Sequence, residues 1–198
     1  MRLVCGLSTE EIARSFLVPV ATMAARVTRA KKKISAARIP YRVPGAAELP
    51  ERVDAVLTVV HLVFTTGHAA PVGDRLVRID LVERALDLGR MLHALMPDEG
   101  EVRGLLALML LTDARRSTRV APDGSLVLLA DQDRTRWDTA AIAEGLDLVG
   151  SAALRAPGRF TVQAAIAGVH AAAPTWQATD WALLLELYDR LLAQWPSP

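Results

Sequence analysis

The sequence predicts a mainly α-helical protein, in which an N-terminal helix-turn-helix precedes an antiparallel helical domain with one short β-hairpin. Three observations indicate this fold class. Apolar residues recur at three- and four-residue steps along most of the 198-residue chain, which is the period of a helix with one buried face. Hydrophobic residues make up 52% of the chain but aromatic residues only 5%, so the expected core is aliphatic. Prolines and glycines break the helical pattern at several points.

The first predicted helix begins near Thr9. Ser8 and Glu11 have the spacing of a capping box, in which each side chain accepts a hydrogen bond from the backbone amide of the other residue. The helix ends before Pro19, because the residue that precedes a proline is pushed away from helical angles. Its apolar face is formed by Ile12, Ala13 and Phe16.

A second helix is predicted to start at Pro19, whose missing backbone donor costs nothing in a first helical turn. Its apolar residues form a stripe that we expect to face the first helix: Val20, Met23, Val27, Ala30 and Ile34. Its other face is basic. A helix-turn-helix of this kind lays its second helix in the major groove of DNA. The predicted DNA-binding residues are Thr22, Arg26, Arg29, Lys31, Lys32 and Lys33.

Charge is distributed unevenly along the chain. No Asp or Glu occurs between Ile12 and Ala47, whereas a merely solvated basic helix would usually interleave both signs. Residues 1–47 carry nine Lys and Arg against two Asp and Glu, for a net charge of +7, and residues 48–198 carry fourteen against twenty, for −6. This asymmetry predicts a nucleic-acid-binding head on an acidic body, with an affinity for DNA that depends strongly on salt.

The predicted organisation has three parts: a helix-turn-helix at 1–37, a linker rich in proline at 38–50, and a helical domain at 51–198. The single Cys5 excludes an internal disulfide framework and fits a reducing compartment. The N-terminus lacks the apolar run of a signal peptide, and no apolar run approaches the length of a membrane span. We therefore expect a soluble, cytoplasmic protein with no membrane partner.

The helical domain is predicted to contain six helices and one hairpin. Gly67 is the expected stop of its first helix. Asp123-Gly124 lies between Val120 and an apolar run, which predicts two short strands within 119–129. The helices are expected at Glu51–Thr66, Asp80–Leu95, Glu99–Arg115, Thr139–Leu154, Thr161–Ala172 and Asp180–Gln194.

Three other groups of residues invite a functional interpretation. Asp131 and Asp133 lack the glycine and the final carboxylate of an EF-hand loop, so we favour a structural ion-pair corner around Trp137 for residues 131–138. His61 and His68 share a helix face without a third zinc ligand, which favours packing over chemistry. We predict no catalytic residue, cofactor or metal site. The aromatic residues near the C-terminus are expected to pack between helices, although an exposed subset could anchor a partner: Trp176, Trp181, Tyr188 and Trp195.

Several strings resemble a known family. Residues 6–13 (Gly-Leu-Ser-Thr-Glu-Glu-Ile-Ala) and 18–23 (Val-Pro-Val-Ala-Thr-Met), with Arg26 and Arg29 following, closely resemble region 4 of extracytoplasmic-function sigma factors. The resemblance implies binding to the −35 promoter element and to the β flap of RNA polymerase. The helical extension of one sigma subgroup resembles residues 49–57, 106–116, 131–138, 163–171 and 179–181. In that subgroup the extension leads into tetratricopeptide-like helices and is thought to regulate activity, so the resemblance makes a regulatory protein a candidate partner of the extension.

Two departures from that family affect the expected function. Members of that family normally carry a region 2, which binds core polymerase tightly and melts the −10 element. Here the helix-turn-helix follows only a few residues after Met1, which indicates either a truncated gene product or a start codon assigned late, and the sequence without region 2 is not expected to initiate transcription alone. Ala24 and Ala25 stand where many family members have polar residues, which leaves fewer groups to bond base edges. The leading hypothesis is a non-enzymatic sigma-factor fragment with a regulatory helical domain. The alternative is a helical protein-interaction module with a vestigial DNA-binding head.

Overall fold

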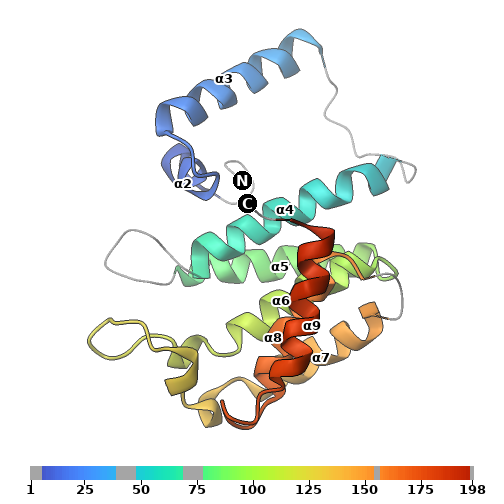
Figure 1. Ribbon diagram of the computed structural model, residues 1–198. Helices are drawn as coiled ribbons and strands as arrows, with labels where there is room; N and C mark the ends of the chain where they lie inside the picture. The colour runs from blue at the N-terminus through green and yellow to red at the C-terminus, as the bar shows by residue number, and fades with distance from the viewer. Residues whose placement is uncertain (1–5, 39–47, 69–77, 154–156, 197–198) are drawn as a thin grey trace.

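The computed structural model describes residues 6–38, 48–68, 78–153 and 157–196, which form eight α-helices and no β-sheet (Figure 1). The prediction of a mainly α-helical protein is confirmed. The α-helices are α2 (Thr9–Ser15), α3 (Val20–Ala36), α4 (Leu49–His68), α5 (Ile79–Leu95), α6 (Gly100–Asp113), α7 (Thr139–Ala153), α8 (Arg159–Ala172) and α9 (Trp181–Gln194). Three short 3₁₀ helices join α6 to α7, namely η2 (Arg116–Thr118), η3 (Leu129–Asp131) and η4 (Arg134–Arg136).

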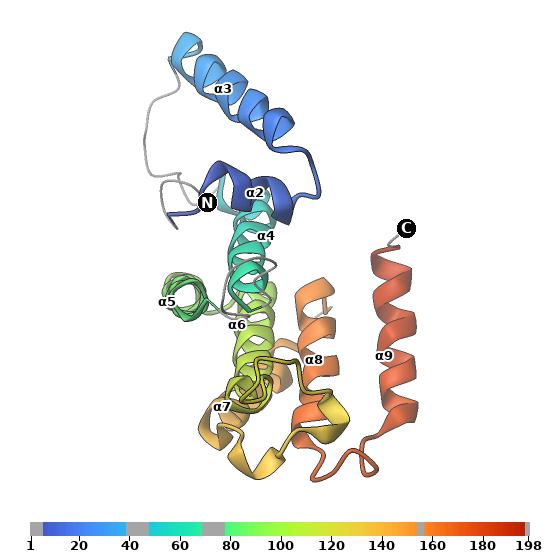
Figure 2. The same cartoon turned by 90° about the vertical axis from the view of Figure 1, so that its left-hand side faces the viewer.

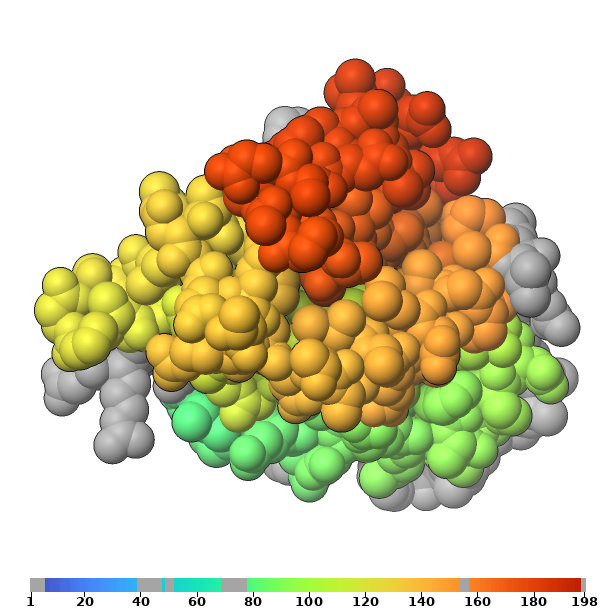
Figure 3. All heavy atoms as spheres, turned by 90° about the horizontal axis from the view of Figure 1, so that it is seen from below, coloured from blue at the N-terminus to red at the C-terminus, as the bar shows by residue number. Residues whose placement is uncertain are grey.

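Helix α6 lies at the centre of the body, in contact with α4, α5, α7 and α8 (Figure 2). Its sequence explains this position, because every residue from Gly104 to Leu111 is buried, and a helix that is apolar all round has to be covered on all sides. Helix α9 lies at the outside of the body and packs on α8. Seen from below, the 3₁₀ segments, α7 and the loop that leads into α9 form one continuous surface (Figure 3).

Helices α6 and α8 approach closely at Gly104 of α6. A Cβ atom at this position would lie 2.5 Å from Thr161 Oγ1 and 2.6 Å from the Thr161 backbone nitrogen. Beside the crossing, the Glu101 carboxylate accepts hydrogen bonds from the backbone amides of Phe160 (2.9 Å) and Thr161 (3.1 Å). Helix α6 thus caps the first turn of α8, whose orphan amides would otherwise lack partners.

The predicted β-hairpin is wrong. Among the described residues of this segment, Val120 and Leu126 form one isolated antiparallel bridge around a turn that contains Gly124 at φ +85°, and no strand develops. Leu126 and Leu128 are 59% and 71% exposed. A two-stranded ribbon without a third strand or a face to bury is not stable, and the chain instead enters the 3₁₀ helix η3 at Leu129.

The helix stop predicted at Gly67 also differs from the structure, because α4 includes Gly67 and extends to His68. The glycine serves a close approach of helices instead. A Cβ atom there would lie 2.8 Å from the Leu81 Cβ and 2.9 Å from the Val82 backbone nitrogen, so α4 and the first turn of α5 could not pack as they do with any larger residue.

The segment 131–138 is a structural corner, as expected, but backbone hydrogen bonds hold it rather than ion pairs. Asp133 caps η4, and Asp138 accepts from the Ala141 amide (3.0 Å) at the start of α7. Arg134 stacks on the Trp137 ring (4.6 Å) and donates to two carbonyls at the end of α8, those of His170 (2.5 Å) and Ala173 (2.7 Å). Asp133 and Asp138 are used as helix caps and Arg134 donates to carbonyls, and no ion pair is present among the charged side chains of residues 131–138.

Candidate nucleic-acid interface

The predicted capping box is present at the start of α2 and is confirmed. Ser8 Oγ accepts a hydrogen bond from the Glu11 amide (3.1 Å), and Glu11 Oε2 accepts one from the Ser8 amide (2.6 Å). Helix α2 ends at Ser15, and Leu17 then adopts a left-handed conformation at φ 52°. Pro19 is the N-cap residue of α3, one position before the first turn. The two helices therefore form the helix-turn-helix that the sequence predicts.

The apolar stripe of α3 faces α2 over only part of its length. Met23 is 6% exposed and packs, together with Val27, in one cluster with Ile12 and Ala13, whereas Ile34 is 53% exposed. The length of the helices explains the difference. Helix α2 has 7 residues and α3 has 17, or about 10 Å against about 25 Å of axis, so the second half of α3 extends beyond the helix that covers it (Figure 2).

Four of the six predicted DNA-binding residues share one line along α3. At about 100° per residue, Thr22, Arg26, Arg29 and Lys33 fall within about 60° of one another and extend over about 17 Å of helix axis. Lys32 lies at the edge of this line. Lys31 lies about 180° from Thr22, on the opposite side of the helix. All six side chains are exposed. We refer to Thr22, Arg26, Arg29 and Lys33 as the basic line.

The charges of the basic line are uncompensated within the described part of the chain. None of its side chains has a salt bridge to a described residue. The two acidic residues of the head both lie in α2 and have other partners, because Glu10 pairs with Arg14 (3.8 Å) and Glu11 closes the capping box. An exposed helix face with unpaired cations is suited to the phosphates of a nucleic acid.

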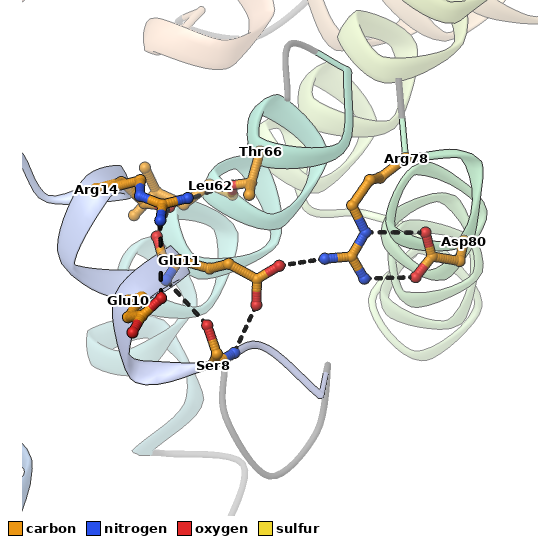
Figure 4. Close-up of polar contacts among 9 residues, drawn as sticks. Ser8, Glu10, Glu11, Arg14, Leu62, Thr66, Arg78 and Asp80 are labelled. Atoms are coloured by element: carbon orange, nitrogen blue, oxygen red, sulfur yellow. Dashed lines mark hydrogen bonds and ion pairs between the residues drawn. The ribbon is translucent and has the colours of Figure 1, made fainter. Parts of the chain in front are cut away.

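The head is held against the body on the side of α2 (Figure 4). Arg78, at the start of α5, donates to Glu11 in α2 and also pairs with Asp80 (2.8 Å). The hydroxyl groups of Ser15 in α2 and Thr66 in α4 share a hydrogen bond, with 2.8 Å between the two oxygens. Leu7, Ile12, Ala13 and Met23 belong to the same hydrophobic cluster as residues of α4, α5 and α6. These contacts anchor α2 to the body, and α2 in turn supports α3.

The electrostatics of Glu11 agree with this dual role as cap and docking residue. Burial acts to raise the pKa of its carboxyl group, but the hydrogen bonds from Ser8 and the charge of Arg78 outweigh burial and hold the pKa below its usual value. Sequence reasoning identified the Ser8 and Glu11 pair and missed Arg78. The two partners are 67 positions apart, and no local pattern relates positions at that separation.

The histidines that were candidates for metal binding or catalysis pack against aromatic rings instead. His61 lies edge-on to Phe160 with 5.3 Å between ring centroids, and His68 stacks on Phe64 at 5.2 Å. Within the ranges that the structure describes, no three His, Cys, Asp or Glu side chains are grouped so that they could hold a metal ion. Nor does any helix among the described residues have the length and apolar character needed to cross a membrane.

Two protein families match parts of the chain. Residues 52–153 match a family of unknown function, DUF6596, and residues 1–34 match Sigma-70, region 4. An uncharacterized protein of Rhizobium meliloti (strain 1021) is 44% identical over 199 aligned residues, which cover 100% of this chain and 47% of the relative. The chain therefore spans about half the length of the curated relative it matches. No solved structure matches the chain.

Proposed function

The chain belongs to the DUF6596 family, and we propose that it acts as a DNA-binding transcription factor of the sigma-70 type, with the DUF6596 domain as its regulatory body. The match of residues 1–34 to Sigma-70, region 4 supports a member of the sigma-70 family with a DNA-binding, sigma-factor-like role. The finer assignment to extracytoplasmic-function sigma factors, and with it contact to a −35 promoter element and to the β flap of RNA polymerase, is part of the proposal. Such a factor would work in the cytoplasm.

The observation that carries this proposal is the uncompensated basic line of α3. The major groove of B-DNA is about 12 Å wide and admits one α-helix, and the basic line covers about five base pairs at 3.4 Å per pair. We propose that Thr22, Arg26 and Arg29 contact base edges and that Lys32 and Lys33 contact phosphates. Contacts of the first kind select a sequence, and contacts of the second kind fix the position of the helix on the duplex.

A fluorescence-polarisation titration of the whole chain with labelled duplex DNA tests this function. Arg26→Ala and Arg29→Ala are each expected to weaken binding about tenfold, because each removes a charged contact worth about 1–3 kcal/mol. Lys31→Ala is the matched control. It removes the same charge from the same helix on the opposite side, and it is expected to weaken binding less than about threefold.

Sequence selectivity is expected to be modest. Ala25 lies beside the basic line and offers only a methyl group, so most base contacts depend on the two arginines and Thr22. Competition with unlabelled duplexes of unrelated sequence measures this selectivity directly.

For the alanine variants, an equal loss of binding for Lys31→Ala and Arg26→Ala would contradict the proposed orientation of α3 in the groove.

The alternative function, a protein-interaction module with a vestigial head, has one observation in its favour. Most of the buried core belongs to α4–α8, and the outer helix α9 exposes large apolar side chains. Under that alternative, Arg26→Ala and Arg29→Ala leave DNA binding unchanged. Wild-type binding that is weak and insensitive to both variants would therefore favour the interaction module over the sigma-type function.

A further inference from the structure

Helix α9 has two apolar faces, and only one of them is covered by other residues that the structure describes. Leu184 and Leu187 are buried, and with Leu191 they pack on Val162 and Ile166 of α8. The second face consists of five residues that we call the outer stripe. Their exposed fractions lie between 46% and 65%. The outer stripe comprises Trp181, Leu185, Tyr188, Leu192 and Trp195.

The outer stripe is narrow and continuous. Its members are spaced by four, three, four and three residues. The four that lie within α9 fall within about 60° of one another and about a quarter-turn from the buried leucines, and Trp195 is the C-cap residue that follows them. Alternating steps of three and four are the spacing of the seam along which two helices pack. A helix with such a seam is suited to pair with a second helix.

Contacts at both ends of α9 hold the outer stripe in place. Asp180 caps the first turn through the Leu183 amide (2.9 Å), and the Trp181 and Trp176 rings pack edge to face at 4.5 Å. At the other end, Arg159 lies over the Trp195 ring (4.3 Å). The side chains of the stripe therefore lose little further freedom when a partner covers them.

The sequence of the outer stripe favours a second copy of this chain as the occupant. Aromatic rings alternate with leucines in the order Trp, Leu, Tyr, Leu, Trp, and this order is the same from either end. In an antiparallel pair centred on Tyr188, the two tyrosines therefore lie against each other, and each leucine and tryptophan lies against its like on the other copy. The two surfaces are self-complementary, as a two-fold axis requires. The stripe carries no charged residue that would select a partner of opposite charge.

The exposed area is consistent with a reversible dimer. The five half-exposed side chains present on the order of 500 Å² of apolar surface, at the upper end of what monomers leave uncovered. Stable interfaces bury about 800 Å² per partner, so a stripe of this size with its flanking residues fits a dimer of moderate affinity. We infer that the chain forms a two-fold symmetric dimer in which the outer stripes of two α9 helices pack antiparallel. This inference does not depend on DNA binding.

Sedimentation or light-scattering measurements of the whole chain over a range of concentrations test the dimer. The expected mass rises with concentration from 21.4 kDa toward twice that value. Leu185→Glu combined with Leu192→Glu is expected to hold the mass at that of one chain, because each charge would be buried in the seam. Leu183→Glu is the matched control on another side of α9, where Leu183 is 40% exposed, and it is expected to leave the dimer intact.

Circular dichroism of all variants checks that helix content and melting are unchanged, which separates loss of pairing from loss of folding. A wild-type mass that stays at 21.4 kDa up to about 100 µM overturns the inference, and the outer stripe then belongs to another partner or to none. A dimer that the double variant leaves intact also overturns it, because the interface then lies elsewhere.

The antiparallel arrangement has a separate test by cysteine cross-linking in a Cys5→Ser background. Tyr188→Cys near the middle of the seam is expected to form a disulfide between copies, whereas Leu192→Cys would be roughly 15 Å from its counterpart, beyond disulfide reach. Equal cross-linking at both positions contradicts an antiparallel pair.

Discussion

Arg78 joins three parts of the molecule through one side chain. It lies at the start of α5, pairs with the nearby Asp80, and reaches Glu11, whose side chain closes the capping box of α2 with Ser8. Both members of the Arg78 and Glu11 pair are partly exposed, so the pair contributes little to overall stability. Its effect is local, because it fixes the helix on which α3 is mounted.

Arg78→Ala is expected to lower the free energy of unfolding by only about 0.5 kcal/mol, yet to increase hydrogen exchange of the α2 amides. Arg90→Ala is the control, since Arg90 makes a comparable exposed pair with Glu144 (2.6 Å) within the body. Hydrogen exchange followed by mass spectrometry should show faster exchange in α2 for the first variant only. Equal exchange in α2 for both variants would refute a positioning role for Arg78.

His68 makes stability depend on pH. Burial lowers its pKa to about 3, and the nearby charges of Arg119, Arg115 and Arg116 act in the same direction. Because the unfolded chain titrates at about 6.5, it binds the proton more readily than the folded chain does. The stabilisation is therefore complete above pH 6.5 and is lost as the pH falls below that value, by about 2 kcal/mol between pH 6.5 and 5.

Urea unfolding of wild type and His68→Gln at pH 7 and pH 5 measures this contribution. The variant is expected to lose less stability between the two pH values. Some pH dependence should remain, because burial also lowers the pKa of His61 and of His170. A pH dependence identical to that of the wild type would show that His68 is not the main titrating group.

At the scale of helices, the crossing of α6 and α8 depends on a residue without a side chain. Gly104→Ala would place a Cβ atom 2.6 Å from the Thr161 backbone nitrogen, and backbone cannot move aside as a flexible side-chain end can. The expected cost is about 1–3 kcal/mol of unfolding free energy. Gly150→Ala in α7 is the control. Nothing lies within 4 Å of its added Cβ, and the better helix propensity of alanine should make it neutral or stabilising.

Thermal melts followed by circular dichroism compare the two alanine variants directly. Gly104→Ala is expected to melt several degrees below the wild type, and Gly150→Ala at or above it. Similar melting temperatures for both would mean that the crossing tolerates a wider separation of α6 and α8.

The elements that sequence reasoning placed correctly are those with a local signal. The α-helices of the described residues follow from apolar periodicity, and the start of α2 follows from the spacing of Ser8 and Glu11. The hairpin failed because a turn signal alone does not supply a third strand. The burial predicted for the apolar stripe of α3 is correct for only part of the helix. How much of the stripe is covered depends on the length of α2, and the sequence of α3 does not determine that length.

The residues of the candidate site could be predicted from the sequence only where their spacing lies within one helix. The spacing of Thr22, Arg26, Arg29 and Lys33 is a property of one helix, and the structure brings them onto one exposed line. Lys31 was predicted with them because it extends the positive charge at the C-terminal end of the helix, and helix geometry places it on the side opposite Thr22. Arg78 and Glu101 act on residues 67 and 59 positions away, and only the folded chain brings such partners together.

At the scale of the whole molecule, the chain combines a basic head with an acidic body that share one hydrophobic cluster. Because α2 is anchored to α4 and α5, a change in the body has a direct physical path to the helix that would contact DNA. The free face of α3 and the outer stripe of α9 are two surfaces of the described residues that remain open to partners.

In the proposed function, the basic residues of α3, which have no salt bridge to a described residue, bind the phosphate backbone and grooves of DNA. The most direct measurement is the salt dependence of duplex binding for the wild type and for the Arg26→Ala, Arg29→Ala double variant. The logarithm of the binding constant should fall against the logarithm of salt concentration with a slope of about −3 to −4 for the wild type, and the double variant should be shallower by about 2. A wild-type slope near zero, or equal slopes for both proteins, would contradict DNA binding through this helix.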